Sequence, residues 1–150
     1  MSNYATIWQM IFPTEHELVT YAENLGKTLS LPAVFELIGD VGAGKTTFAR
    51  GLAKGLGVKT PITSPSFSIS NRYIFPLKTQ PDKTGLLIHY DFYRLDDPGL
   101  MQFELEEALS LPNSVVLIEW GASVKKLLPA SSKTITFRIL PNDARQVEIS

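Results

Sequence analysis

The chain has 150 residues, of which 44% are hydrophobic and 19% charged, and its formal net charge is −1. This length predicts a single domain over residues 1–150 with a buried core, and the balanced charge excludes a broad electrostatic footprint for DNA or RNA. The absence of cysteine excludes disulfides and thiolate metal sites, and no apolar run is long enough to span a membrane.

The first expected elements are a strand and a helix. Residues 5–11 favour a strand. Thr14 followed by Glu17 has the capping-box pattern and predicts a helix over 14–30 that packs against the sheet. Gly26 inside this helix costs about 1 kcal/mol relative to alanine. The apolar stripe of the helix consists of Leu18, Ala22, Leu25 and Leu29.

The next segment has the sequence of a phosphate-binding loop. The apolar run 33–38 predicts a buried parallel strand, and residues 47–56 predict the body of a helix that ends at Gly57. Between them stands the pattern G-x-x-x-x-G-K-[ST], as Gly39-Asp40-Val41-Gly42-Ala43-Gly44-Lys45-Thr46. Glycines let backbone N–H groups point at phosphate oxygens, and the helix N-terminus adds further free N–H groups. Strand, loop and helix in this order predict a site for nucleotide phosphates.

The residue types of this loop assign particular roles. Lys45 supplies the positive charge for the β- and γ-phosphates, and the Thr46 hydroxyl is a ligand for Mg²⁺. We expect a nucleotide, ATP or GTP, with Mg²⁺ as the bound species. The other expected nucleotide contacts are Asp40, Val41, Gly42, Ala43, Gly44 and Thr47.

After the helix, the chain predicts an antiparallel strand pair. Residues 67–75 alternate, with Phe67, Ile69, Tyr73 and Phe75 on one face, which indicates a half-exposed strand. A polar loop over 76–85 then leads to a strand over 86–92.

The last third of the chain predicts two helices and three strands. Asp97-Pro98 indicates a helix start, with a helix through Leu109. A buried strand over 115–118, a short helix near 122–128 and strands over 133–140 and 145–149 follow. The order of elements predicts an α/β fold of the three-layer P-loop NTPase type, with parallel central strands and antiparallel additions.

Two acidic residues close apolar strands, Asp91 after 86–90 and Glu119 after 115–118. In open α/β sheets ligands bind beyond the carboxyl ends of the strands, where an acid can hold Mg²⁺ or orient an attacking water. An acid at a strand end can also simply solvate a loop. Because a phosphate loop needs such an acid, we predict Lys45, Asp91 and Glu119 as catalytic residues, and we interpret His89 as a packing residue.

Four segments together resemble the TsaE family, formerly YjeE. They are the phosphate loop through Thr47, Thr63-Ser64-Pro65-Ser66-Phe67, His89-Tyr90-Asp91-Phe92-Tyr93-Arg94-Leu95, and Ile118-Glu119-Trp120. The resemblance implies an ATPase that works with the TsaD and TsaB proteins to make threonylcarbamoyladenosine on ANN-decoding tRNAs. Contact with tRNA would then be indirect, through the complex.

The resemblance also implies residue roles. Thr63 would lie near the metal in a switch-like segment, beside the metal ligands Thr46, Asp91 and Glu119, and Glu119 would orient the attacking water. Arg94 and Trp120 match family positions without an assigned role. The chain departs from the family pattern after Asp97-Pro98, since Gly99-Leu100-Met101-Gln102 stands where an acidic run is usual.

Other functions remain open at this level. A small-molecule kinase shares the loop, although it usually adds an arginine-rich lid, and a GTPase lacks support because no N-K-x-D motif occurs. A nucleotide-gated binding module would need no hydrolysis. With only five arginines and no arginine pair, we expect slow hydrolysis by the protein alone. Residues 1–4 show no basic segment leading into an apolar core, which favours the cytoplasm.

Overall fold

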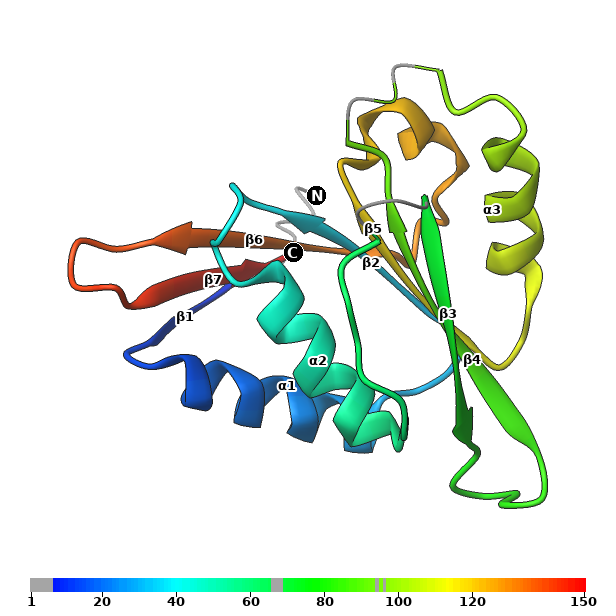
Figure 1. Cartoon of the computed structure of the whole chain (residues 1–150), viewed down its shortest axis with the longest axis horizontal. Helices are drawn as coiled ribbons and strands as arrows, with labels where there is room; N and C mark the ends of the chain where they lie inside the picture. The colour runs from blue at the N-terminus through cyan, green and yellow to red at the C-terminus, as the bar shows by residue number, and fades with distance from the viewer. Residues whose placement is uncertain (1–6, 66–68, 94, 96) are drawn as a thin grey trace, which may run out of the picture.

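The computed structural model describes residues 7–65, 69–93, 95 and 97–150, and these form a seven-stranded sheet with helices on both faces (Figure 1). The strand order across the sheet is β1-β7-β6-β2-β5-β4-β3. The elements in chain order are β1 (Trp8–Phe12), α1 (Glu15–Thr28), β2 (Ala33–Ile38), α2 (Lys45–Leu56), β3 (Ser70–Pro76), β4 (Thr84–Asp91), α3 (Met101–Ser110), β5 (Ser114–Glu119), the 3-10 helix η1 (Gly121–Leu127), β6 (Lys133–Ile139) and β7 (Arg145–Ile149).

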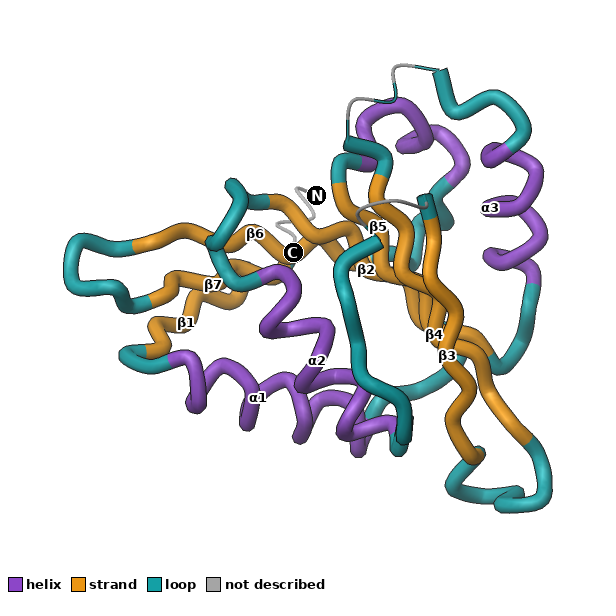
Figure 2. The backbone as a smooth tube through the Cα atoms, in the orientation of Figure 1, coloured by secondary structure: helices purple, strands orange, loops and turns teal. Residues whose placement is uncertain are grey.

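The centre of the sheet is parallel. Strand β2 pairs in parallel with β5 and β6, and β5 pairs in parallel with β4. The added strands are antiparallel, β3 on β4, β7 on β6 and β1 on β7, and the tube in Figure 2 follows this order across the sheet. The expected α/β fold with a parallel centre is therefore confirmed, and β2 delivers the phosphate loop from the middle of the sheet.

Helices α1 and α2 cover one face, and α3 and η1 cover the other (Figure 1). Leu18 and Ala22 of α1 are fully buried on the first side, and the capping box of Thr14 and Glu17 is formed, as predicted. Phe48 and Leu52 of α2 belong to the same core. Since β5 is buried along its whole length, both layers depend on it.

Helices α1 and α2 touch along their backbones. A Cβ atom added to Gly26 would lie 2.4 Å from the Leu52 carbonyl oxygen, and one added to Gly55 would lie 2.0 Å from the Glu23 carbonyl oxygen. Gly26, which costs helix propensity in α1, is therefore required by the close approach of α2.

Two sequence predictions are wrong in detail. The helix expected at Asp97-Pro98 begins three residues later, because Gly99 has φ +54° and its N–H donates to Asp97 Oδ1 at 2.9 Å, which makes a turn before α3. Ile69 precedes β3 and packs against the second core, whereas Tyr73 and Phe75 lie in the first core. The predictions for residues 5–6, Ser66, Phe67, Ser68 and Arg94 lie outside the described residues.

Candidate nucleotide-binding site

The loop between β2 and α2 has the backbone that its glycines predict. Gly44 has φ +117° and Gly42 has φ +82°, conformations that side-chain-bearing residues rarely adopt. The Ala43 N–H donates to the Asp40 carbonyl at 3.0 Å and so closes the turn before the helix. The free N–H groups of the first turn of α2 follow directly, which is the arrangement that binds phosphates.

Lys45 lies at the start of α2 with its side chain turned back over the loop. Its Nζ donates to the carbonyl oxygens of Gly39 and Asp40, the latter at 2.9 Å. The same ammonium group lies 5.6 Å from the centroid of the Trp120 ring, within cation–π range. The one buried lysine among the described residues is thus held at the mouth of the phosphate loop.

A cavity of about 330 Å³ opens beside this lysine. Asp91 and Glu119 both line it, because they are register partners at the carboxyl ends of β4 and β5. The structure therefore brings together the three residues predicted as catalytic. The full lining is Val41, Gly42, Gly44, Lys45, Thr46, Thr47, Arg50, Ser64, Asp91, Tyr93, Glu119 and Trp120.

Glu119 is paired with a histidine that the sequence interpretation set aside. His89 Nε2 lies 2.8 Å from Glu119 Oε1, and the two residues are 1% and 4% exposed. Among the described residues His89 Nδ1 is buried without a hydrogen-bond partner. The only sequence signal for this pairing is that His89 stands two positions before Asp91 and so points to the same side of β4.

The pKa of the Asp91 carboxyl group is raised above its ordinary value. Burial raises the pKa of this carboxyl group, a hydrogen bond from the Tyr93 N–H at 2.9 Å opposes the rise, and the negative charge of Glu119 reinforces it. Two carboxyl groups side by side in a poorly solvated cavity favour a cation between or beside them. The metal-binding role of Asp91 stays a prediction.

Trp120 and Tyr93 form an aromatic wall of the cavity. Their ring centroids lie 4.9 Å apart at an interplanar angle of 48°, and both rings remain partly exposed. Trp120 has φ +56°, an uncommon conformation for a residue other than glycine, so the chain turns sharply just after Glu119. This turn places the indole on the cavity side, next to Lys45.

The predicted contacts Thr47 and Thr63 have other partners. The Thr47 hydroxyl donates to Glu15 Oε1 at 3.1 Å, and Arg50 Nη2 lies 3.2 Å from the same oxygen. Thr63 donates its N–H to the Tyr73 hydroxyl at 3.2 Å and is absent from the cavity lining, where Ser64 stands instead. The metal role of Thr63 therefore stays a prediction. Arg50 and Ser64 line the cavity, although the sequence interpretation gave neither of them a site role.

The donor set fits a metal carried by a nucleotide. No group of three or more His, Asp or Glu side chains suited to hold a metal ion by themselves occurs in the described part of the chain. Mg²⁺ bound with ATP takes only one or two protein ligands and otherwise keeps phosphate oxygens and water. Thr46, Asp91 and Glu119 around one cavity can supply these ligands.

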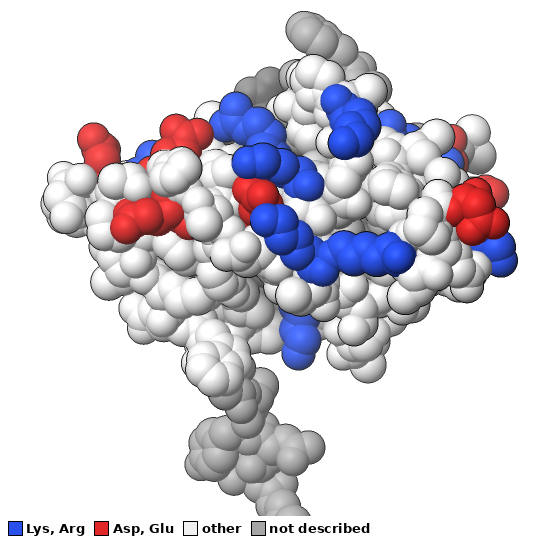
Figure 3. Space-filling view, turned by 90° about the horizontal axis from the view of Figure 1, so that it is seen from below, with Lys and Arg blue, Asp and Glu red and all other residues white. Residues whose placement is uncertain are grey.

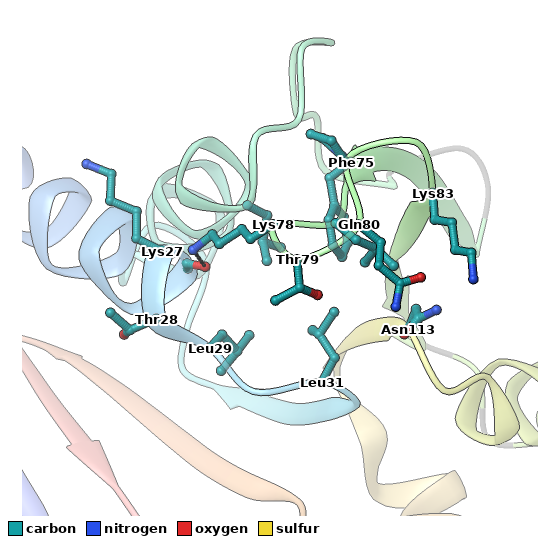
Figure 4. A pocket seen from close by; sticks show the side chains of 14 residues that line it. Lys27, Thr28, Leu29, Leu31, Phe75, Lys78, Thr79, Gln80, Lys83 and Asn113 are labelled. Carbon is teal, nitrogen blue, oxygen red and sulfur yellow. Dashed lines mark hydrogen bonds between the residues drawn. The ribbon is translucent and has the colours of Figure 1, made fainter.

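A larger cavity of about 530 Å³ lies between the end of α1 and the β3–β4 hairpin (Figure 4). Its apolar walls include Leu29 and Leu31, and lysines surround it, with Lys78 Nζ donating to the Gly26 carbonyl at 3.4 Å. No residue of the phosphate loop lines it. It is therefore separate from the candidate nucleotide site.

Comparison with known proteins decides the family. The family model described as "Threonylcarbamoyl adenosine biosynthesis protein TsaE" matches residues 12–147. The chain belongs to the TsaE family. The residues matched by the TsaE model include the phosphate loop, Asp91 and Glu119. Among the described residues, no helix is long and apolar enough to cross a membrane.

Individual TsaE proteins match over most of their length. The protein named "tRNA threonylcarbamoyladenosine biosynthesis protein TsaE" from Rickettsia bellii is 35% identical over 144 residues, 95% of this chain and 94% of the relative. The one of the same name from Bacillus subtilis is 31% identical over 93% of this chain and 82% of the relative. The crystal structure of Bacillus subtilis YdiB matches with a TM-score of 0.75 and 27% identity, over 99% of this chain and 87% of that one. TsaE membership and the fold thus rest on independent comparisons.

Proposed function

We propose that this TsaE-family protein binds ATP with Mg²⁺ and hydrolyses it slowly, as an accessory subunit that acts with TsaD and TsaB in forming threonylcarbamoyladenosine on tRNA. The observation that carries the proposal is the convergence of Lys45, Asp91 and Glu119 on one cavity at the phosphate loop. The relatives' names, which place them in tRNA threonylcarbamoyladenosine biosynthesis, support the biological role.

The chain's own groups divide the work of phosphoryl transfer to water. The Lys45 ammonium neutralises charge on the transferred phosphate, and the N-terminus of α2 holds the phosphates through its free N–H groups. Thr46 and Asp91 hold Mg²⁺, which when bound supplies further charge neutralisation. Glu119 has one oxygen engaged by His89, so its second oxygen is the one that orients the attacking water.

We expect slow ATP hydrolysis by the protein alone because few arginines line the cavity. Arg50 is the only arginine of the described chain that lines the cavity, and its guanidinium is paired with Glu15. Efficient phosphoryl transfer to water commonly needs a guanidinium on the developing charge. A partner that inserts an arginine or displaces Glu15 would complete the site.

The experiment measures ATP turnover by the purified protein alone and with TsaD and TsaB, for wild type, Lys45→Ala and the control Lys126→Ala, an exposed lysine that is not part of the cavity lining. Thermal unfolding verifies that each variant is folded. We expect slow turnover alone, a rise of about tenfold or more with the partners, and loss of both in Lys45→Ala only.

Each other outcome redirects the proposal. If the partners neither bind nor change the rate, the tRNA-modification role is wrong, and phosphorylated product in a metabolite screen would assign a kinase. If a Glu119→Gln variant binds ATP, fails to hydrolyse it and still supports threonylcarbamoyladenosine formation, the protein is a nucleotide-gated binding module.

A further inference from the structure

Helix α3 carries two faces, of which only one is used inside the molecule. The inner face packs on β4 and β5 through Leu105 and Ala108. Four exposed residues form a stripe on the outer side of the helix, at the spacing i, i+3, i+4 and i+7 that brings helical residues to one side. We call this stripe the α3 patch. It consists of Leu100, which directly precedes α3, and of Phe103, Glu104 and Glu107. Leu100 is 81% exposed and Phe103 is 65% exposed.

The two exposed apolar side chains of the α3 patch, Leu100 and Phe103, lie close together in the sequence. Single exposed apolar residues are ordinary on protein surfaces, but two large ones within one helical turn form a continuous apolar spot. Leu100 and Phe103 lie at the start of α3. Met101 and Leu105 of the same helix pack in the core instead. An apolar spot with a polar border is the typical centre of a protein interface.

The charged side chains of helix α3 itself are of one sign, while the cationic Arg72 of β3 lies beside the Tyr90 hydroxyl under this helix. Helix α3 contains Glu104, Glu106 and Glu107 and no basic residue. Glu106 is engaged by the Gln102 amide at 3.2 Å, which leaves Glu104 and Glu107 bordering the apolar pair on the outer stripe. A complementary surface therefore offers an apolar pocket bordered by lysine or arginine.

The strand beneath α3 also reaches the nucleotide cavity. The Tyr90 hydroxyl of β4 donates to the Glu104 carbonyl at 3.4 Å, and the next residue of the same strand is Asp91. The Phe92 N–H then donates to the Glu119 carbonyl at 3.0 Å. A partner seated on α3 would thus contact a helix bonded to the strand that carries a catalytic acid.

We propose that the α3 patch is the docking surface for the protein partner of the ATPase cycle, received by an apolar pocket with a lysine- or arginine-rich border. This inference rests on the proposed partner-dependent function. An RNA ligand is disfavoured because phosphate groups would face Glu104 and Glu107.

A second copy of the chain is the other occupant to consider. Basic side chains gather on the face seen in Figure 3. Lys27 and Lys54 both pair with Glu23. The cavity of Figure 4 has lysines around it and a lining of both apolar and polar side chains. The α3 patch of one copy in that cavity of another would be a head-to-tail contact between two different surfaces. Such contacts propagate into chains unless the rotation closes a ring, so a different protein is the better occupant.

The test compares wild type with Leu100→Ala/Phe103→Ala, Glu104→Lys/Glu107→Lys and the control Ile74→Ala, which removes an equally exposed apolar side chain from β3. Affinity for the TsaD–TsaB complex is measured by calorimetry at two salt concentrations, alongside turnover by each variant alone and its mass in solution. We expect roughly a 30-fold loss of affinity for the alanine pair and none for Ile74→Ala. The charge reversal weakens binding and removes its salt dependence, and turnover alone is unchanged in every variant.

The outcomes separate the inference from the function beneath it. Wild-type binding with unchanged affinity in both double variants would overturn the α3 patch and leave the proposed function intact. Absence of wild-type binding would overturn both. Concentration-dependent assembly of the wild type that the alanine pair abolishes would replace the partner by a second copy of this chain.

Discussion

The imidazole of His89 lies 2.8 Å from the carboxylate of Glu119, although the two residues are not register partners. His89 stands opposite Leu117, and Glu119 stands opposite Asp91, so the bond runs diagonally between β4 and β5. Both strands are in the parallel centre of the sheet, and Glu119 is only 4% exposed, so little water competes with the imidazole for the carboxylate. The histidine therefore fixes the direction in which the second carboxylate oxygen points.

Replacing His89 by alanine is expected to lower kcat about 10- to 100-fold, the usual cost of removing a group that orients a functional side chain. Glutamine places an amide N–H near the position of Nε2 and should restore most of the activity. ATP affinity and unfolding temperature should stay close to wild type in His89→Gln, measured by nucleotide titration and thermal unfolding. Equal loss of activity in both variants would contradict a positioning role.

Exchanging the two acids for their amides separates their roles. Glu119→Gln should lower kcat by about 10²-fold or more and leave ATP binding intact, since under the proposed function it removes the group that orients water. Asp91→Asn should instead raise the Mg²⁺ concentration needed for half-maximal turnover. Magnesium titrations of turnover distinguish the two, and full turnover by Glu119→Gln would mean that the assignments are reversed.

The raised pKa of Asp91 should make the free energy of unfolding depend on pH. Because burial raises the pKa of its carboxyl group, the folded chain binds more protons than the unfolded chain between the ordinary pKa and the raised one. The free energy of unfolding contributed by this group therefore falls as the pH rises through that window. Asp91→Asn should unfold at a higher temperature than wild type at neutral pH without metal, and this advantage should vanish at acid pH. An equal difference at both pH values would contradict the effect.

The contact between α1 and α2 predicts an unfavourable Gly26→Ala substitution. Alanine would gain about 1 kcal/mol of helix propensity, but its Cβ would lie 2.4 Å from the Leu52 carbonyl oxygen. Overpacking of this kind lowers the free energy of unfolding by about 1–3 kcal/mol. Asn24→Ala, at an exposed position of the same helix, is the control in urea unfolding and should be neutral or stabilising. A stabilised Gly26→Ala would show that the helices can separate without loss.

The sequence predicts much of the site because its signals are local. The loop from Gly39 to Thr46 has a fixed spacing, and Asp91 and Glu119 each end an apolar run. Parallel strands bring their carboxyl ends to one edge, so the convergence of these residues follows from local pattern and one topological rule. The helix packing of Leu18 and Ala22 follows from periodicity in the same way.

The parts that escaped prediction depend on register and on contacts between distant segments. The pairing of His89 with Glu119 needs the alignment of β4 on β5, and that of Arg50 with Glu15 needs the position of α1 beside α2. The start of α3 differs from the expected one because Asp97-Pro98 fits both a helix start and the turn that Gly99 makes. Neither spacing nor composition carries this information.

The glycine contact between α1 and α2 also has a mechanical consequence. Two helices that meet backbone to backbone, as at Gly26 and Gly55, have no layer of flexible side chains between them to absorb sliding. Helix α2, which starts at the phosphate loop, therefore cannot easily shift against α1, and the two helices form one rigid unit. If the chain binds ATP as proposed, the phosphates would therefore rest against a rigid support formed by both helices.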